Sequence, residues 1–432
     1  MKISYQKDIP VMGSFDVMVC GGGFAGVAAA VAAARKGANV MFIEHYGFLG
    51  GMATAAGIGE FWASPIGENS IFEEIRERLG KLYGITANKH SYDGEKVKFV
   101  LQEMIAENSN IKLRLHTRAI DVIRNNNLVK AIIIHGKSGI EAVEAKIIVD
   151  TTGDGDVAFL AGASFQKGRP TDQVQLAMGY IFTMWDTHEK VKPVLPEGCK
   201  KYKDDEPLPF GKWHKSKGGR VYCHMGKIIH HDSTDSDSLT EAEILARRQM
   251  MSLVYYVQTH GGSTYTLATS PVQVGVREGR RIVGEYILTE KDITTGRKFE
   301  DAVAVGTSNI DFHDPDIIGG RGEGRIESVP PYHIPYRCLL VKDLDNMLTA
   351  GKCISGDQVA QSSYRMIPTC AAMGQAAGTA AALCVKQNIS LREIDTTFLR
   401  TTLEKDGIEL DLNKILPWHY TAGGKWWIES RA

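Results

Sequence analysis

The chain has 432 residues, of which 43% are hydrophobic and 23% charged, the balance of a globular protein with a sizeable core. At roughly 150 residues per domain, this length predicts two or three domains. The 50 Lys and Arg residues nearly cancel the 51 Asp and Glu residues, so no global positive field draws the chain to nucleic acid or to an anionic membrane.

Strands and helices alternate in the first third of the chain. Residues 15–20 form a short apolar run typical of a buried strand, helix formers follow Gly26, and residues 39–44 form a second strand-like run. Together they predict a β-α-β unit. Apolar residues at helical spacing predict two amphipathic helices, and β-branched runs predict further strands. These segments are 71–83 and 95–108 for the helices, and 111–123, 128–135 and 145–150 for the strands.

The character of the sequence changes after about residue 165. Residues 186–240 are polar with weak periodicity, 240–258 predict one long helix, and 311–335 have the composition of a loop. Strand and helix patterns return at 346–350 and 369–387. We therefore predict an α/β fold in which a Rossmann-like domain, a parallel sheet flanked by helices, carries an inserted α+β substrate domain. The predicted boundaries are 1–165 and 336–390 for the discontinuous cofactor domain, 166–335 for the insertion and 391–432 for a C-terminal extension.

The seven cysteines include no C-x-x-C pair, which argues against a disulfide framework, a zinc knuckle and a dithiol redox centre. The run from His230 to Asp232 could ligate a metal, but its Ser- and Asp-rich surroundings favour a solvated loop, so we predict no metal site. The N-terminus lacks the apolar core of a signal peptide, and the Ala- and Gly-rich segment 366–385 is a weak membrane former. We expect a soluble, cytoplasmic protein.

A glycine motif follows the first predicted strand. Gly21, Gly23 and Gly26 fit G-x-G-x-x-G, in which the first glycine permits a sharp turn, the second lets the backbone approach a pyrophosphate and the third lets the helix press against the sheet. The helix N-terminus then offers N–H groups and a positive dipole end to phosphates. Glu44 closes the second strand, where a carboxylate accepts hydrogen bonds from ribose and repels the 2′-phosphate of NADP. The motif predicts a dinucleotide site.

Five segments, in order, resemble the FAD-dependent oxidoreductases with the glutathione-reductase-type (GR2-like) FAD fold, in the branch that lacks a second nucleotide domain. They are VMVCGGGFAGVAAAVAAARKGANVMFIE after residue 16, GFLGGMATAAG (47–57), IIVDTTGDGDVAFLAGA (147–163), VGVREGRRIVGEYILTEKDI (274–293) and the long segment 334–383. The resemblance implies that the dinucleotide is FAD.

The resemblance also implies which residues bind FAD. In the family, a Gly-Gly pair passes beside the pyrophosphate and the flavin ring, and a strand backbone meets the adenine. A T-G-D-G-D stretch forms a second FAD fingerprint, and an Ala- and Gly-rich helix directs its N-terminus at the pyrimidine edge of the flavin. The matching positions are Gly21, Gly23, Phe24, Ala25, Gly26, Glu44, His45, Gly50, Gly51, Met52, Thr54, Ala119, Thr152, Gly153, Asp154, Gly351, Gly374 and Gln375.

Each of these segments also has a plainer interpretation. The Gly50-Gly51 pair could be an ordinary turn, and residues 152–156 could be a surface loop with an Asx turn. The Gly374-x-x-x-Gly378 spacing could serve close helix packing alone. These interpretations do not exclude contact with a cofactor.

Features that the chain lacks narrow the reaction. No second strand–GxGxxG–helix unit is present, and the glycine cluster at 319–324 is predicted to be a mobile loop, so a disulfide reductase with an NAD(P)H domain is disfavoured. Aromatic hydroxylases of this fold continue the second fingerprint with Asp-Gly-Ser-Arg, whereas this chain continues with Asp156-Val157-Ala158. The electron partner is therefore expected to be the substrate, a second small molecule, a carrier protein or oxygen.

A flavin enzyme that transfers hydride needs a nearby acid or base to move a proton. The candidates fall in three stretches: the family-like Y-H-I-P-Y-R segment, the residue before the flavin-facing helix, and the insertion. Structural roles compete with each, since the histidines could be satisfied in the core and Arg277 could pair with Glu278. The candidate catalytic residues are Arg365, Arg337, His333, Tyr336, Arg277 and His224.

These observations predict an FAD-dependent oxidoreductase, a dehydrogenase or reductase, that transfers hydride between bound FAD and a small polar organic substrate bearing a carboxylate or several hydroxyls. The acceptor or carrier and the oligomeric state stay open. The alternatives are a redox-sensing flavin module without catalysis and an FAD-dependent RNA-modifying enzyme, which the neutral charge disfavours. The Trp-rich segment 417–429 could cover a pocket or a partner subunit.

Overall fold

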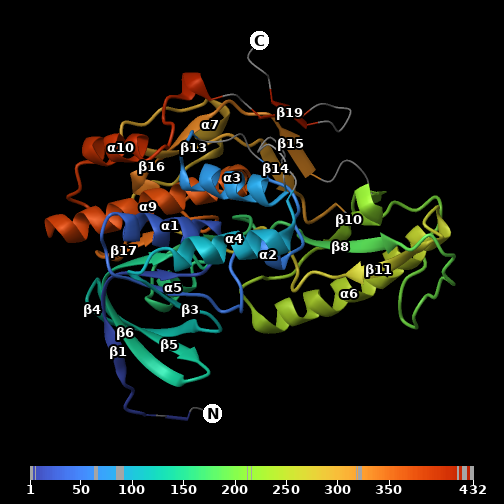
Figure 1. Cartoon of the computed structure of the whole chain (residues 1–432), viewed down its shortest axis with the longest axis horizontal. Helices are drawn as coiled ribbons and strands as arrows, with labels where there is room; N and C mark the ends of the chain where they lie inside the picture. The colour runs from blue at the N-terminus through green and yellow to red at the C-terminus, as the bar shows by residue number, and fades with distance from the viewer. Residues whose placement is uncertain are drawn as a thin grey trace.

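The computed structural model describes residues 3–4, 6–62, 67–83, 92–211, 213–215, 217–317, 319 and 324–415, and the backbone of 418–420 and 426–428 (Figure 1). Two predictions fall largely or wholly outside these residues. They are the mobile loop at the glycine cluster 319–324 and the covering role of the side chains in 417–429.

A mostly parallel sheet supports the glycine motif. Strand β1 pairs in parallel with β2 and β6, β2 with β3, and the C-terminal half of β6 with β17. The N-terminal half of β6 continues into an antiparallel β5–β4 ribbon. This arrangement confirms the predicted Rossmann-like core, and β17 shows that a late segment of the chain completes it. The strands are β1 (Val11–Cys20), β2 (Val40–Ile43), β3 (Ile111–Arg114), β4 (Arg118–Asn125), β5 (Leu128–Gly136), β6 (Gly139–Asp150) and β17 (Met347–Thr349).

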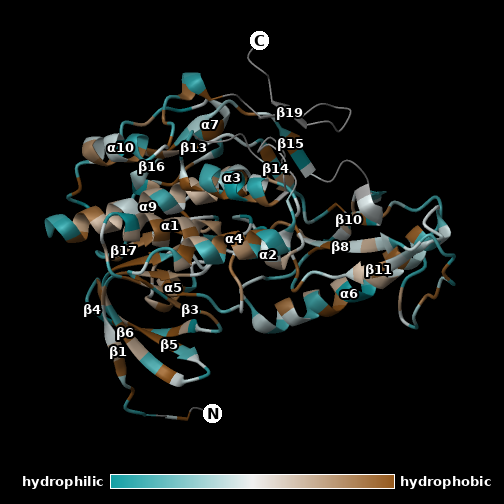
Figure 2. Cartoon of the chain, viewed as in Figure 1, coloured by the Kyte–Doolittle hydropathy of each residue, from teal (hydrophilic) through white to brown (hydrophobic). Residues whose placement is uncertain are grey.

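Two buried helices from opposite ends of the chain pack against each other over this sheet. Helix α1 (Phe24–Arg35) and helix α9 (Ile367–Gln387) share one hydrophobic cluster with the sheet, where brown residues gather in Figure 2. A Cβ atom on Gly374 would lie 2.0 Å from the carbonyl oxygen of Ala25, and one on Gly378 would lie 2.1 Å from that of Ala29. The G-x-x-x-G spacing therefore lets the two backbones touch. Helices α3 (Ile71–Tyr83) and α4 (Gly94–Ala106) lie beside them.

A second, antiparallel sheet has its own core. Its strand order is β11-β8-β10-β9, and the long helix α6 (Ser236–Thr259) packs on it, at the right of Figure 1. Helix α6 begins four residues earlier than the predicted helix because the Asp235 carboxylate caps it by accepting from the Ser238 amide at 2.8 Å. The strands are β8 (Met178–Asp186), β9 (Trp213–Lys215), β10 (Arg220–Ile228) and β11 (Tyr265–Thr269).

The prediction of a loop over 311–335 is wrong in part. Strand β14 (Ile310–His313) pairs with β15 (Gly324–Glu327), and β13 (Ala302–Gly306) pairs with β16 (Tyr332–Pro335). These strands are only four or five residues long and are separated by Gly, Pro and charged residues, which conceals them in the sequence. Val305 and Ile334 join the hydrophobic cluster of α1 and α9 rather than that of the second sheet. The predicted domain boundary at 335 does not coincide with a change of core.

The remaining described elements are short, and no helix in the described ranges is long and apolar enough to cross a membrane. They are α2 (Met52–Ala55), α5 (Asp156–Leu160), β7 (Phe165–Lys167), β12 (Arg280–Ile282), α7 (Glu290–Thr294), α8 (Gln358–Tyr364), α10 (Thr396–Lys405), β18 (Trp418–Tyr420) and β19 (Trp426–Ile428).

The substitution Gly378→Val tests the contact between α1 and α9. Its side chain has no room against the Ala29 carbonyl, so we expect the free energy of unfolding to fall by about 1–3 kcal/mol or more. Gly94→Ala is the control, because a Cβ there meets nothing closer than the Thr54 Cα at 4.0 Å. Equal urea-denaturation midpoints for the two variants would contradict the packing account.

Candidate functional site

The glycine motif forms the turn from β1 to α1. Gly21 has φ +103°, and a Cβ there would lie 2.4 Å from the Thr151 carbonyl oxygen, so the turn itself requires a glycine. A Cβ on Gly26 would lie 1.8 Å from the Gly21 carbonyl oxygen, so the turn requires this one as well. Gly23 differs, because a Cβ there would meet only the Gly51 Cα, at 4.0 Å. The space beside Gly23 is open, as a cradle for a pyrophosphate requires.

The first turn of α1 faces this space without a side-chain cap. Gly23 is the N-cap residue and makes no side-chain hydrogen bond to the helix, so the first N–H groups stay available to an anion. Phe24 points into the core, where its ring packs edge-on against Phe61 with centroids 5.8 Å apart. Gly351, with φ +97°, lies against Ala25. Phe24, Ala25 and Gly351 thus offer backbone, not side-chain, contacts to a cofactor.

Gly50 and Gly51 form the opposite wall. The Gly50 amide donates to the Gly22 carbonyl at 2.8 Å, and a Cβ on Gly51 would lie 2.9 Å from the Gly23 Cα. The Thr54 hydroxyl donates to the Leu49 carbonyl at 3.0 Å and so fixes the turn. The pair is both a tight turn and a lining of the space beside Gly23.

Glu44 lies at the end of β2 with its carboxylate turned inward. The carboxylate accepts hydrogen bonds from the amides of Gly22 and Tyr46 and lies 2.8 Å from Nδ1 of His45. The Thr117 amide donates to the Glu44 carbonyl at 2.9 Å, which brings the chain before β4 to the same place. The predicted adenine-side strand residue, Ala119, lies two residues farther along β4.

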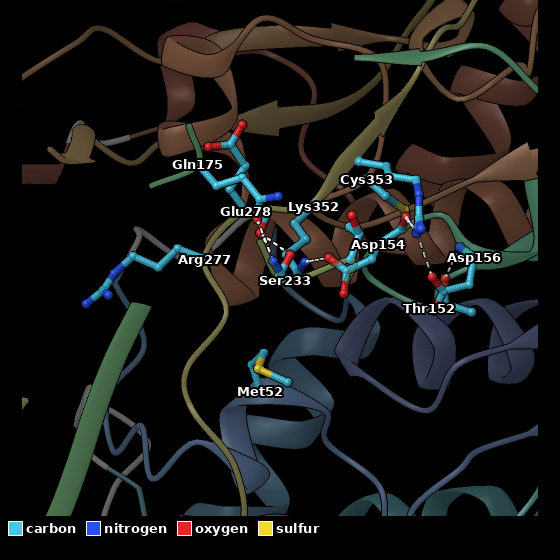
Figure 3. Close-up of polar contacts among 12 residues, drawn as sticks. Met52, Thr152, Asp154, Asp156, Gln175, Ser233, Arg277, Glu278, Lys352 and Cys353 are labelled. Carbon is cyan, nitrogen blue, oxygen red and sulfur yellow. Dashed lines mark hydrogen bonds and ion pairs between the residues drawn. The ribbon is translucent and has the colours of Figure 1, made fainter. Parts of the chain in front are cut away.

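The T-G-D-G-D stretch lies at the carboxyl end of β6, beside the glycine turn. The Thr152 hydroxyl donates to Asp150 at 2.7 Å and accepts from the Asp156 amide at 2.8 Å, while Asp154 pairs with Lys352 (Figure 3). Burial, with the charges of Asp154 and Asp150, raises the pKa of Asp156 to about 6. Ligands of parallel α/β sheets bind at the carboxyl ends of the strands, so this stretch is correctly placed for one.

Gly374 and Gln375 do not lie at the start of a helix. Helix α9 begins at Ile367, about two turns earlier, because Pro368 suits a first turn. The Gln375 amide accepts from the Ile71 amide and donates to the Asp406 carbonyl, both at 2.9 Å. The structure therefore shows packing roles for Gly374 and Gln375, and their predicted contact with the flavin stays a prediction.

A partly buried polar cluster lies between α8, β14 and the second sheet. We call Asp311, Arg365, His313, His224 and Arg277 the Asp311 cluster. Nη2 of Arg365 donates to the Asp311 carboxylate at 2.6 Å, and Nε2 of His313 lies 3.1 Å from the same oxygen. The rings of His224 and His313 both pack on Phe210, with centroids 4.2 and 5.5 Å away. Arg277 donates to the Ala177 carbonyl at 2.7 Å.

The cluster keeps its carboxylate ionised and its histidines neutral. Burial alone would raise the pKa of Asp311, but His313, Arg365 and Arg277 together hold it well below its usual range. Burial first, and then the charge of Arg277, lowers the pKa of His313 to about 4 and that of His224 well below its ordinary value. Two neutral imidazoles therefore lie beside two guanidinium ions at neutral pH.

Three predicted catalytic residues thus come together, Arg365, Arg277 and His224. The expected alternative for Arg277, a pair with Glu278, is not seen, since Glu278 pairs with Arg281; in Figure 3 the Arg277 side chain extends away from Glu278. Asp311 and His313 were missed as site residues because DFHDPD has the composition of a capped turn.

The other three candidates contact different segments. Nε2 of His333 bonds the Leu410 carbonyl at 2.8 Å while its Nδ1 accepts from the Phe299 amide, and the Tyr336 hydroxyl donates to the Leu391 carbonyl. Arg337 pairs with Asp301 in an open pocket of about 610 Å³. The polar atoms of His333 and Tyr336 hydrogen-bond the backbone of neighbouring segments, and a catalytic role for these residues stays a prediction.

The substitution His313→Asn tests the burial of a neutral histidine. Between pH 6.5 and 4, an unfolded histidine binds a proton that native His313 does not bind. Acidification through this window therefore favours the unfolded wild-type chain, by up to roughly 3 kcal/mol from this residue. We expect the wild type to lose more stability than His313→Asn between neutral pH and about pH 5, measured by urea denaturation. His188→Asn, at a mostly exposed histidine, should behave like the wild type; parallel pH profiles for wild type and His313→Asn would refute the assignment.

A comparison with protein-family models identifies the family to which the chain belongs. A family model described as FAD dependent oxidoreductase matches residues 16–403. Among solved structures, the chain is similar to a geranylgeranyl bacteriochlorophyll reductase-like protein from Thermoplasma acidophilum. The two sequences are 15% identical, the match covers 91% of this chain and 83% of that chain, and the TM-score is 0.44. It is also similar to OxyS anhydrotetracycline hydroxylase from Streptomyces rimosus (11% identity, 90% and 65% covered, TM-score 0.43) and to p-nitrophenol 4-monooxygenase PnpA from Pseudomonas putida DLL-E4 (13% identity, 91% and 89% covered, TM-score 0.40). Since the family model spans nearly the whole chain, this protein belongs to the FAD dependent oxidoreductase family, and its cofactor is FAD.

Proposed function

We propose that this protein transfers hydride between bound FAD and a small polar organic substrate that lies against the Asp311 cluster. The observation that carries the proposal is geometric: two guanidinium groups and two imidazoles surround the Asp311 carboxylate in one partly buried place. Clusters of charged and imidazole side chains whose pKa values are shifted by burial and by neighbouring charges are common at functional sites.

The cluster is joined to the residues predicted to face the flavin. The segment that carries Arg277 begins against α2, where the Val272 amide donates to the Ala55 carbonyl at 2.8 Å and Gln273 donates to Sδ of Met52 at 3.4 Å. Gln361 of α8 donates to the Arg277 carbonyl at 2.8 Å, and α8 leads into the first turn of α9. A substrate at the cluster would therefore lie near Met52 and the start of α9.

The residues present fit FAD held as in the glutathione-reductase-type fold. The open space beside Gly23, the uncapped α1 and the inward Glu44 carboxylate would hold the pyrophosphate and ribose. When bound, the flavin supplies the hydride acceptor or donor. Arg365 and Arg277 would bind and orient the substrate, and His224, whose Nε2 is unbonded within the described residues, would hydrogen-bond the reacting oxygen of the substrate.

Gly23→Val tests the pyrophosphate cradle. The added Cβ would lie no closer than 4.0 Å to the Gly51 Cα and the side chain would fill the open space, so we expect the FAD-free protein to keep its unfolding midpoint while FAD affinity falls at least about tenfold, or about 1.4 kcal/mol. FAD content after purification and fluorescence titration of the apoprotein measure this. A variant that binds FAD as tightly as the wild type would show that the cofactor lies elsewhere.

Anaerobic reduction tests the reaction itself. We expect at least one small organic acid, alcohol or amine to bleach the visible flavin band of the holoprotein, or its oxidised counterpart to restore the band after chemical reduction. His224→Asn should slow this step by about 10²–10³-fold, the usual cost of removing one hydrogen-bonding group placed at the reacting oxygen, with FAD content unchanged. A flavin that responds to none of these compounds in either direction contradicts the proposal.

A further inference from the structure

Buried polar atoms without partners gather around the Asp311 cluster. Buried polar side-chain atoms are normally hydrogen-bonded, and each exception destabilises the folded state unless a ligand or water satisfies it. The turn before β14 lies against α8, since the Ser363 hydroxyl donates to the Ser308 carbonyl at 2.6 Å. Both segments, with β10 and the first turn of α9, carry such exceptions in the described part of the chain. The atoms are Nε2 of His224, Nδ2 and Oδ1 of Asn309, Oε1 of Gln361, Nε of Arg365 and Oγ1 of Thr369.

Arg365 is held so that one donor remains unused. Its Nη2 donates to both the carbonyl and the carboxylate of Asp311, at 3.1 and 2.6 Å, which fixes the guanidinium plane. Its Nε is buried and meets no acceptor among the residues described. Because a guanidinium only donates, the missing partner must be an acceptor. Asp311 is thus a positioning residue that presents Arg365 and fixes the His313 ring.

The electrostatic surroundings favour an acceptor that carries negative charge. The charge of Arg277 lowers the pKa values of His224, His313 and Asp311, so its positive field reaches every titratable member of the cluster. The Asp311 carboxylate is already engaged by Arg365 and His313. A hydrogen bond from a guanidinium to an anionic oxygen is about twice as strong as one between neutral groups.

We propose that the substrate is a small organic carboxylate, whose two oxygens accept hydrogen bonds from Nε of Arg365 and Nδ2 of Asn309, with its reacting hydroxyl or carbonyl toward Nε2 of His224. This inference rests on the proposed function and names the substrate class of the same site. A polyol would satisfy the donors but gain nothing from the positive field. A phosphate has three acceptor oxygens, more than these two donors match.

Paired acids and amides test the charge requirement. Lactate and lactamide, or benzoate and benzamide, have nearly the same shape but differ in charge. We expect the holoprotein to bind the acids at least about tenfold more tightly than the amides, measured by isothermal titration calorimetry and by perturbation of the visible flavin spectrum. Equal affinity for acids and amides, or no measurable binding of any acid, overturns the inference.

Two variants locate the binding. Arg365→Met removes the donor, and Asn309→Asp keeps the shape but places a negative charge beside the carboxylate; each should weaken acid binding at least about tenfold and leave amide binding little changed. Arg325→Met, at a half-exposed guanidinium paired with Glu327, is the control and should bind acids like the wild type. If Arg365→Met loses FAD or folds poorly, acid binding by Asn309→Asp decides whether the carboxylate lies at this site. Acid binding that survives in a folded Asn309→Asp variant contradicts the assignment.

The two proposals can fail separately. If acids bind as expected but never change the redox state of the flavin, the hydride-transfer proposal fails and the carboxylate site stands. If neutral compounds bleach the flavin and acids neither bind nor compete with them, the reaction stands and the carboxylate assignment fails.

Discussion

The contact between the backbones of α1 and α9 is the constraint on which both halves of the site depend. Glycines at 374 and 378 let α9 lie against the carbonyls of Ala25 and Ala29 without intervening side chains. Helix α1 carries the glycine turn at its start, and α9 follows directly from Arg365. The approach of these helices therefore sets how far the predicted pyrophosphate cradle lies from the Asp311 cluster, although the two are encoded at opposite ends of the chain.

The Asp311 cluster shows how burial and charge can divide roles among similar groups. Desolvation alone would neutralise Asp311 as well as the histidines. The neighbouring guanidinium ions reverse this for the carboxylate and reinforce it for the imidazoles, because positive charge opposes protonation of both. The site therefore holds a fixed anion that orients Arg365, and neutral imidazoles that can hydrogen-bond a ligand. An isolated Asp–Arg pair such as Asp301–Arg337 has no such division of roles.

Apolar periodicity and glycine spacing predicted the helices and strands whose formation depends mainly on neighbouring residues in the sequence. The β1–α1–β2 unit, the helix at 71–83 and the buried helix near 369–387 follow from apolar periodicity and glycine spacing, and the structure has them within a few residues. The sequence does not show the strands at 302–335 clearly, because each is too short for an alternating apolar pattern to be visible. Val305 on β13 and Ile334 on β16 are buried in the cluster of α1 and α9, far away in the sequence. Three of the six catalytic candidates, His224, Arg277 and Arg365, lie together around Asp311, whereas the other three lie elsewhere. Strand pairing and the position of α8 determine which residues meet, and spacing along the sequence does not show this. Gln375 shows a different limit, because a position matched by family resemblance lies inside α9, about two turns after its first residue.

The late position of β17 and α9 in the chain has a consequence for biosynthesis. The strand that extends the parallel sheet beyond β6 and the helix that covers α1 arise only after residue 346, so most of the polypeptide is synthesised before the hydrophobic cluster of α1 and α9 can be completed. The core of the second sheet differs, because all of its buried residues lie between 178 and 276. Contacts between distant segments slow folding and leave apolar surface exposed meanwhile, so the nascent chain exposes the apolar surface of α1 until α9 has been synthesised.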